Sequence, residues 1–181
     1  MWLFIKHLIQ LLLSPSRGWD DVSESVLKAD EVQRKGFYPL VGVTALSEFF
    51  PLVYSHSEGF THSLVAAIGI ACSLFASMYL SKLFLDFFMP KLIDGTLNQN
   101  KVSVFVSCML GLNCIYYTIR NLMPTSMTLL TLMPLLSVIV IFKSTAYMGI
   151  KEDNQLNFTG LAIVAVIGIP ILISSLILCF M

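Results

Sequence analysis

Long apolar stretches alternate with short polar breaks along most of this chain. Five stretches carry few charges and are long enough to cross a bilayer: 36–54, 63–89, 102–122, 127–147 and 156–181. About 20 apolar residues in a helix cover the roughly 30 Å of hydrocarbon in a membrane. Such spans should be helical, because an exposed strand edge cannot satisfy its backbone groups in lipid. The pattern therefore predicts an all-α integral membrane protein whose five spans pack as one transmembrane bundle.

The first 13 residues form an apolar run that is too short to span a membrane. Its apolar side chains recur at helical spacing along one stripe, made of Trp2, Ile5, Ile9 and Leu12. Lys6 and Gln10 fall away from that stripe. We interpret this run as an amphipathic helix that lies in the membrane interface. A signal sequence is one alternative, although no A-x-A-like cleavage site follows, and a buried segment is another.

A Ser-Pro pair separates this run from a charged segment. Pro15 fits the first position of a new helix and disfavours helical geometry at Ser14, so one helix should end and another begin here. Trp19 starts a narrow apolar stripe on an otherwise polar helix, continued by Val22, Val26 and Ala29. We expect Trp2 and Trp19 to act as membrane-interface anchors at the headgroup level. The chain thus divides into an N-terminal interfacial and cytoplasmic segment, 1–35, and a bundle, 36–181.

Composition supports the membrane assignment. The chain is 56% hydrophobic and only 12% charged, with a mean hydropathy of +0.81. A soluble domain has about 25% charged residues. The formal net charge is zero, so nothing indicates a nucleic-acid partner.

Basic residues predict the orientation. All Lys and Arg residues except Arg120 precede the first predicted span or lie near the connections after the second and fourth. With five spans these positions share one face. The positive-inside rule then places the N-terminus in the cytoplasm and the C-terminus outside, in a multi-pass protein of the cell inner membrane.

Five ionisable residues fall within or near the spans, as a candidate intramembrane polar site: Glu48, Arg120, Lys82, Asp86 and Lys143. Each costs about 2.5–3.5 kcal/mol at a bilayer centre on insertion scales, so each should have a partner or lie near an interface. Glu48 and Arg120 both lie towards the outer side and are expected to pair. Lys82 and Asp86 lie four residues apart on one helix face. Either these residues form a polar path, with Glu48 as a proton or cation site, or they are structural pairs and snorkelling lysines.

Motifs of enzymes and cofactor sites are missing. The sequence contains no P-loop, no H-E-x-x-H and no G-x-S-x-G, and we predict no cofactor. His56, Glu58 and His62 are metal-ligand types in one outer loop, but their spacing matches no standard site. All four cysteines fall in apolar stretches, where they are expected to be small buried hydrophobes.

The order of these elements resembles the bacterial branch of the Yip (Ypt-interacting protein) family. The resemblance lies in the amphipathic run, the stretch SPSRGWDDV, the charged segment and the closely spaced spans. A P-x-x-x-W element, matched by Pro15 and Trp19, precedes the bundle in that branch. The Asp-Leu-Tyr-Gly-Pro signature of eukaryotic members, which are associated with Rab-type GTPases, is absent. The resemblance therefore implies a fold and does not imply GTPase binding.

Three functions remain as hypotheses. The first is a non-enzymatic integral membrane protein that organises protein partners or lipids, with the bilayer, a membrane protein or a second copy as its partner. The second is a small transporter or channel subunit that uses Glu48 and neighbouring polar residues. The third is a membrane enzyme or metal protein based on the histidine-containing outer loop.

The topology can be tested with reporter fusions. A periplasm-active reporter inserted at Glu58 or fused after Met181 should be active, because both positions are predicted to lie outside. A cytoplasmic signal at Glu58 would show that the predicted orientation is wrong.

Overall fold

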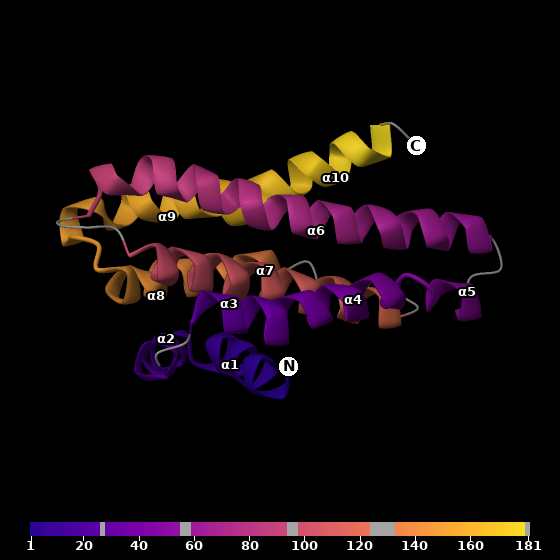
Figure 1. Ribbon diagram of the computed structural model, residues 1–181, viewed down its shortest axis with the longest axis horizontal. Coiled ribbons are helices and arrows are strands. Elements are labelled where there is room, and N and C mark those ends of the chain that lie inside the picture. The colour runs from indigo at the N-terminus through magenta and orange to yellow at the C-terminus, as the bar shows by residue number, and fades with distance from the viewer. Residues whose placement is uncertain (26–27, 55–58, 94–97, 124–132, 180–181) are drawn as a thin grey trace.

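The computed structural model describes residues 1–25, 28–54, 59–93, 98–123 and 133–179. Its long helices run side by side along the molecule, and two short N-terminal helices lie against one side of them (Figure 1). The described part of the chain contains no strand, only one isolated antiparallel bridge. The all-α prediction is confirmed.

Four helices among the described residues are long and apolar enough to cross a membrane: Ala29–Tyr54, Phe60–Lys91, Gln99–Leu122 and Glu152–Ile177. They correspond to the first, second, third and fifth predicted spans, and they mark this chain as a membrane protein. The fourth, 127–147, begins outside the described residues, and its described part is the shorter apolar helix α8 (Met133–Met148). A count of five spans therefore stays a prediction.

The N-terminal segment folds as two helices with the predicted break between them. Helix α1 (Trp2–Leu13) ends at Ser14, and helix α2 (Pro15–Glu24) begins with Pro15 at its first turn. The face of α1 that packs on the bundle carries its buried residues, Phe4, Leu8 and Leu11. The predicted stripe lies beside this face: its residues Trp2 and Ile9 are exposed, and Ile5 and Leu12 are half-buried. Helix α1 is therefore apolar on both its buried and its exposed side.

Two glycines allow α1 to sit close to its neighbours. A Cβ atom at Gly36 would lie 2.5 Å from the ring of Phe4, and one at Gly18 would lie 2.9 Å from the backbone of Leu11. Small residues at such positions let helix backbones approach closely. Any larger side chain at Gly18 would push α1 away from α2, because backbone atoms cannot rotate aside.

The first span is continuous with the charged segment. Helix α3 (Ala29–Val32), a π-helical turn η1 (Gln33–Phe37) and α4 (Tyr38–Ser47) follow one another without a break. A short helix α5 (Pro51–Tyr54) follows. The boundary expected between residues 35 and 36 thus falls inside a helix, and the expected polar cytoplasmic helix is divided between α2 and α3.

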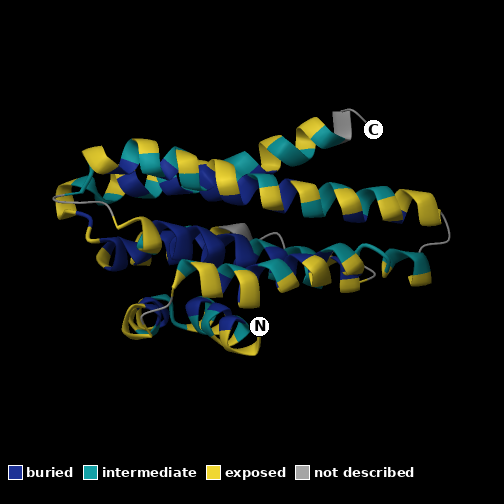
Figure 2. Cartoon of the chain, in the orientation of Figure 1, coloured by how far each residue is buried: buried dark blue, intermediate teal, exposed yellow. Residues whose placement is uncertain are grey.

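Helix α7 (Gln99–Leu122) is the centre of the bundle. Every residue in 102–112 is buried, and the dark-blue band along this helix in Figure 2 marks the core. Helix α6 (Phe60–Phe88), extended by a 3₁₀ turn η2 (Met89–Lys91), packs against it and also against α4 and the last helix. The core therefore sits between helices, around one span that meets protein on every side.

The last span bends at a proline. After a short turn η4 (Glu152–Asn154) come α9 (Gln155–Ile163), a π-helical turn η5 (Val164–Gly168) and α10 (Ile169–Cys179). Pro170 at the start of α10 has no N–H to donate to the preceding turn, which leaves carbonyls there without a backbone donor.

Side chains of two other helices satisfy these carbonyls. The Asn113 amide of α7 donates to the Val166 carbonyl at 3.0 Å, and the Ser81 hydroxyl of α6 donates to the Ala165 carbonyl at 2.5 Å. Because both donors come from neighbouring spans, the bend is fixed by the bundle. Beyond it α10 stays packed against α6, while among the described residues it no longer packs closely against α7.

Trp19 occupies a different environment from the one expected. Its ring is only 2% exposed and stacks between Phe105 and Tyr147, at centroid distances of 5.6 and 5.0 Å. Its indole N–H donates to the Val140 carbonyl at 2.9 Å. The expectation that this ring meets lipid headgroups is corrected: its partners are protein groups of α7 and α8, which satisfy both its apolar surface and its donor.

The two tryptophans provide a matched test of this packing. Trp19→Ala should lower the free energy of unfolding by about 3–5 kcal/mol, as expected for emptying a large buried site. Trp2→Ala, at a side chain that is 82% exposed, should change it by less than about 0.5 kcal/mol. Equilibrium unfolding in mild detergent would measure both. Equal effects would contradict the burial of Trp19.

Candidate functional site

The structure divides the five predicted polar residues between separate places. Glu48, just after α4, and Arg120, near the end of α7, line one cavity. Lys82 and Asp86 lie near the C-terminal end of α6 (Phe60–Phe88). Lys143 of α8 lines a different hollow, beside Trp19.

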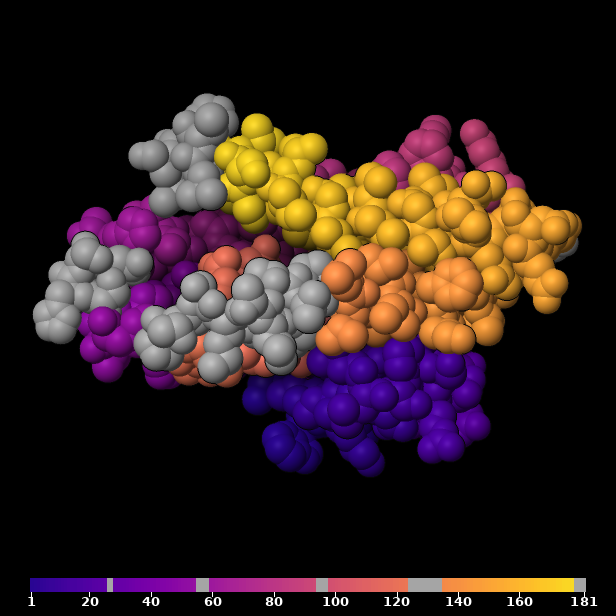
Figure 3. Space-filling model, turned by 180° about the vertical axis from the view of Figure 1, so that it is seen from behind, coloured from indigo at the N-terminus to yellow at the C-terminus, as the bar shows by residue number. Residues whose placement is uncertain are grey.

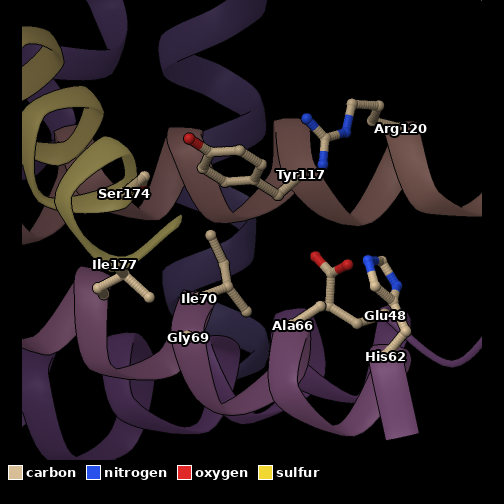
Figure 4. A pocket seen from close by; sticks show the side chains of 9 residues that line it. All are labelled: Glu48, His62, Ala66, Gly69, Ile70, Tyr117, Arg120, Ser174 and Ile177. Carbon is tan, nitrogen blue, oxygen red and sulfur yellow. The ribbon is translucent and has the colours of Figure 1, made fainter. Parts of the chain in front are cut away.

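The cavity that contains Glu48 and Arg120 lies between four helices. It has a volume of about 250 Å³, and α4, α6, α7 and α10 contribute to its wall. Figure 4 shows the charged side chains gathered at one end and the aliphatic ones at the other. Its polar lining residues are Glu48, His62, Tyr117, Arg120 and Ser174, and its apolar or small ones are Ala66, Gly69, Ile70 and Ile177.

Glu48 is held by an amide and not by a guanidinium. The side-chain amide of Asn121 donates to the Glu48 carboxylate at 2.7 Å. Arg120 instead lies over the ring of Tyr117, with its guanidinium carbon 5.3 Å from the ring centroid. The ion pairs within 4 Å among the described residues are both in the charged segment before α4. The expected direct pair between Glu48 and Arg120 is therefore wrong.

Asn121 belongs to a row of polar side chains between α4 and α7. Its amide also donates to the Ser47 hydroxyl at 3.0 Å, and the hydroxyl of Tyr54 donates to its backbone carbonyl. One turn deeper, the Thr44 and Thr118 hydroxyls lie 3.2 Å apart. Each hydroxyl in the row also has a carbonyl partner on its own or the facing helix. As a result, the Glu48 carboxylate accepts a hydrogen bond from the neutral Asn121 amide and also lines the cavity.

The inner polar residues do not extend this cavity. None of Lys82, Asp86 or Lys143 is among its lining residues. One carboxylate oxygen of Asp86 is buried without a hydrogen-bond partner among the described residues, while Lys143 is exposed. Among the described residues, this cavity is thus confined to one end of the bundle, and the inner polar residues lie apart from it.

Several residues of this site were missed by sequence reasoning. Asn121 is the partner of Glu48, and Tyr117 forms the wall beneath Arg120. The spacing offered a signal: Thr118 and Asn121 are three residues apart on α7, as Thr44 and Ser47 are on α4. Two polar rows of helical spacing in apolar spans are typical of interhelical hydrogen bonding.

The histidine-containing loop is described only in part. His62 lies in the first turn of α6 and lines the cavity, whereas His56 and Glu58 lie outside the described residues. Among the residues that are described, no group of three His, Cys, Asp or Glu side chains is arranged to hold a metal ion.

No family model matches this chain, and neither a curated protein nor a solved structure matches it.

The role of Asn121 can be tested by its removal. Asn121→Ala should destabilise the protein by about 1–3 kcal/mol, because it leaves a carboxylate and a hydroxyl without their donor. Arg120→Ala should cost less than about 1 kcal/mol, because the exposed guanidinium has no carboxylate partner within reach. Unfolding measurements in detergent compare the two. A larger loss for Arg120→Ala would instead indicate the direct pairing with Glu48.

Proposed function

We propose that this protein is a non-enzymatic integral membrane protein that organises lipids or protein partners from an N-terminal platform. The platform consists of α1 and α2. Its place is the cytoplasmic face of the cell inner membrane, with the C-terminus outside. The resemblance to the bacterial branch of the Yip family points to the same architecture.

The observation that carries this proposal is the exposed apolar face of α1. Trp2 and Leu13 are each 82% exposed and Ile9 is 47% exposed, although the opposite face of the same helix is buried in the bundle. Exposed apolar groups of this size on one short helix mark an interaction surface. A helix of this length and pattern, held beside transmembrane helices, suits the boundary between headgroups and acyl chains.

The charged surface next to α1 supports a second role of the platform. Helix α2 turns Ser16, Arg17 and Asp20 outward, while Trp19 on its other face ties it to α7 and α8. Two further exposed pairs, Asp30–Arg34 and Glu31–Lys35, lie at the start of the first span. Such a rigidly held polar surface is available to a membrane-protein partner or to a second copy.

A transporter or channel subunit remains the alternative. It needs a polar path, and the cavity beside Glu48 is lined by residues from one end of the bundle only. That geometry favours the binding of a ligand at one end of the bundle over the passage of a substrate through it.

Brominated lipids test the contact between α1 and the bilayer. In a Trp19→Phe variant the remaining Trp2 fluorescence should be strongly quenched by lipids brominated on their acyl chains, because bromine quenches only on close contact. In a Trp2→Phe variant the buried Trp19 should be quenched much less. Vesicles that contain the full-length protein would serve for both.

A second pair of variants separates membrane contact from folding. Ile9→Glu and Leu13→Glu together place charge on the exposed face of α1 and should abolish the quenching of Trp2 while the unfolding transition is kept. Lys91→Glu, at an exposed position in η2 away from α1, is the matched charge change. Quenching of Trp2 by aqueous iodide but not by brominated lipid would contradict the platform.

A further inference from the structure

The cavity at Glu48 is graded from charged to apolar along its length. Its charged end lies near the ends of two spans: His62 is in the first turn of α6 and Arg120 in the last turn of α7, while Glu48 follows the last residue of α4 inside the span Ala29–Tyr54. A span ends where the hydrocarbon meets the headgroups, so this end of the cavity lies close to them. The aliphatic end, with Ile70 and Ile177, lies deeper in the bundle (Figure 4).

The bend at Pro170 creates this space. Before the bend the last helix is tied to α6 and α7 through Ala165 and Val166. After it, α10 stays packed against α6, where the Ser73 and Ser174 hydroxyls lie 3.0 Å apart, but among the described residues it no longer packs closely against α7. In Figure 3, α6 and α7 are visible in a recess beside α10.

The charged end presents both signs to a ligand. The Glu48 carboxylate, which accepts from one amide, has lone pairs left for a cationic donor. The Arg120 guanidinium carries five N–H donors, and its contact with described residues is the face of Tyr117. His62 adds a second nitrogen group on the side of Glu48 (Figure 4).

We infer that this cavity binds the headgroup of a zwitterionic phospholipid with a primary ammonium group, of the phosphatidylethanolamine class. Arg120 contacts the phosphate and Glu48 accepts hydrogen bonds from the ammonium. The first carbons of an acyl chain lie against Ile70 and Ile177. This site goes beyond the proposed platform, since it shares no residue with α1.

Charge and hydrogen bonding select this class over other phospholipids. A choline headgroup is cationic, but its trimethylammonium has no N–H to donate to Glu48. A glycerol headgroup has no cation, so its phosphate would approach Glu48 without compensation. An ammonium group that donates to a carboxylate gains a charge-assisted hydrogen bond, which is about twice as strong as a neutral one.

The volume fits a headgroup and not a whole lipid. A cavity of about 250 Å³ is slightly below the roughly 300–1,000 Å³ of small-molecule pockets. That is enough for a phosphoethanolamine group and the start of one chain, so most of both chains stay in the bilayer. The ligand is thus a lipid of the surrounding leaflet that is held by its polar end.

Native mass spectrometry of the full-length protein tests the inference. The protein is released from nanodiscs that contain equal amounts of phosphatidylethanolamine, phosphatidylcholine and phosphatidylglycerol with identical chains. The wild type should retain phosphatidylethanolamine about tenfold over the other two, in line with one charge-assisted hydrogen bond. Equal retention of all three lipids would falsify the site.

Four variants assign the selectivity to this cavity. Glu48→Gln keeps an oxygen for the Asn121 amide but should reduce the preference to within about twofold, because the charge-assisted bond is lost. Gly69→Leu should fill the apolar end and reduce retention of every lipid. Lys143→Gln and Gly42→Leu are the matched controls: Lys143 is an exposed charge outside the cavity, and a Cβ at Gly42 meets nothing within 4 Å.

A competition experiment distinguishes a membrane lipid from a water-soluble molecule with the same headgroup. Glycerophosphoethanolamine, which has the headgroup without chains, should not compete with the retained lipid. Effective competition would identify a water-soluble zwitterion as the ligand and overturn the lipid assignment. A preference that survives both Glu48→Gln and Gly69→Leu would place it elsewhere on the protein. Quenching of Trp2 by brominated lipid is independent of headgroup and thus tests the platform separately.

Discussion

The enclosure of α7 is the constraint on which the rest of the structure depends. A span that is buried along 102–112 cannot leave any face to lipid, so other helices must cover all its sides. Helices α4 and α6 cover two of these sides, and α8 and the π-helical turn η5 also contact α7. Helix α1 completes the enclosure, since Phe4 and Leu8 lie where a side chain at Gly111 would be. The N-terminal helix is therefore a structural part of the bundle.

Local sequence patterns predicted the bounds of the spans well, but they predicted poorly which residues pack against each other. The stretches 63–89 and 102–122 match helices Phe60–Lys91 and Gln99–Leu122 closely, because hydrocarbon thickness sets the length of an apolar run. The first span begins earlier than its apolar run, at Ala29, because i,i+4 ion pairs support helix beyond the hydrocarbon. The position of Trp19 was not predictable, because its binding site is formed by α7 and α8 and leaves no trace in the surrounding sequence.

In the candidate site, too, the sequence predicted which residues matter but not which residues they contact. Glu48 and Arg120 were recognised as costly intramembrane charges, and both do line one cavity. Their direct pairing was wrong because Asn121, adjacent to Arg120, places a donor closer to the carboxylate. A neutral amide orients the carboxylate without neutralising it, so both charges remain available to a ligand. A sequence pattern identifies ionisable side chains whose placement in a membrane costs free energy. Whether such a side chain has a charged or a neutral partner depends on the rotation and depth of the helices.

The contact between Trp19 and Val140 has a consequence for the order of synthesis. The two residues are 121 positions apart. At about 5–20 residues per second, the ribosome needs about 6–24 s to make the second after the first. When Val140 is made, α1 and α2 have already left the ribosome, and until then the α8 part of the site that buries Trp19 does not exist. The two N-terminal helices are therefore made first, but the site against which they pack is complete only after α8 has been made.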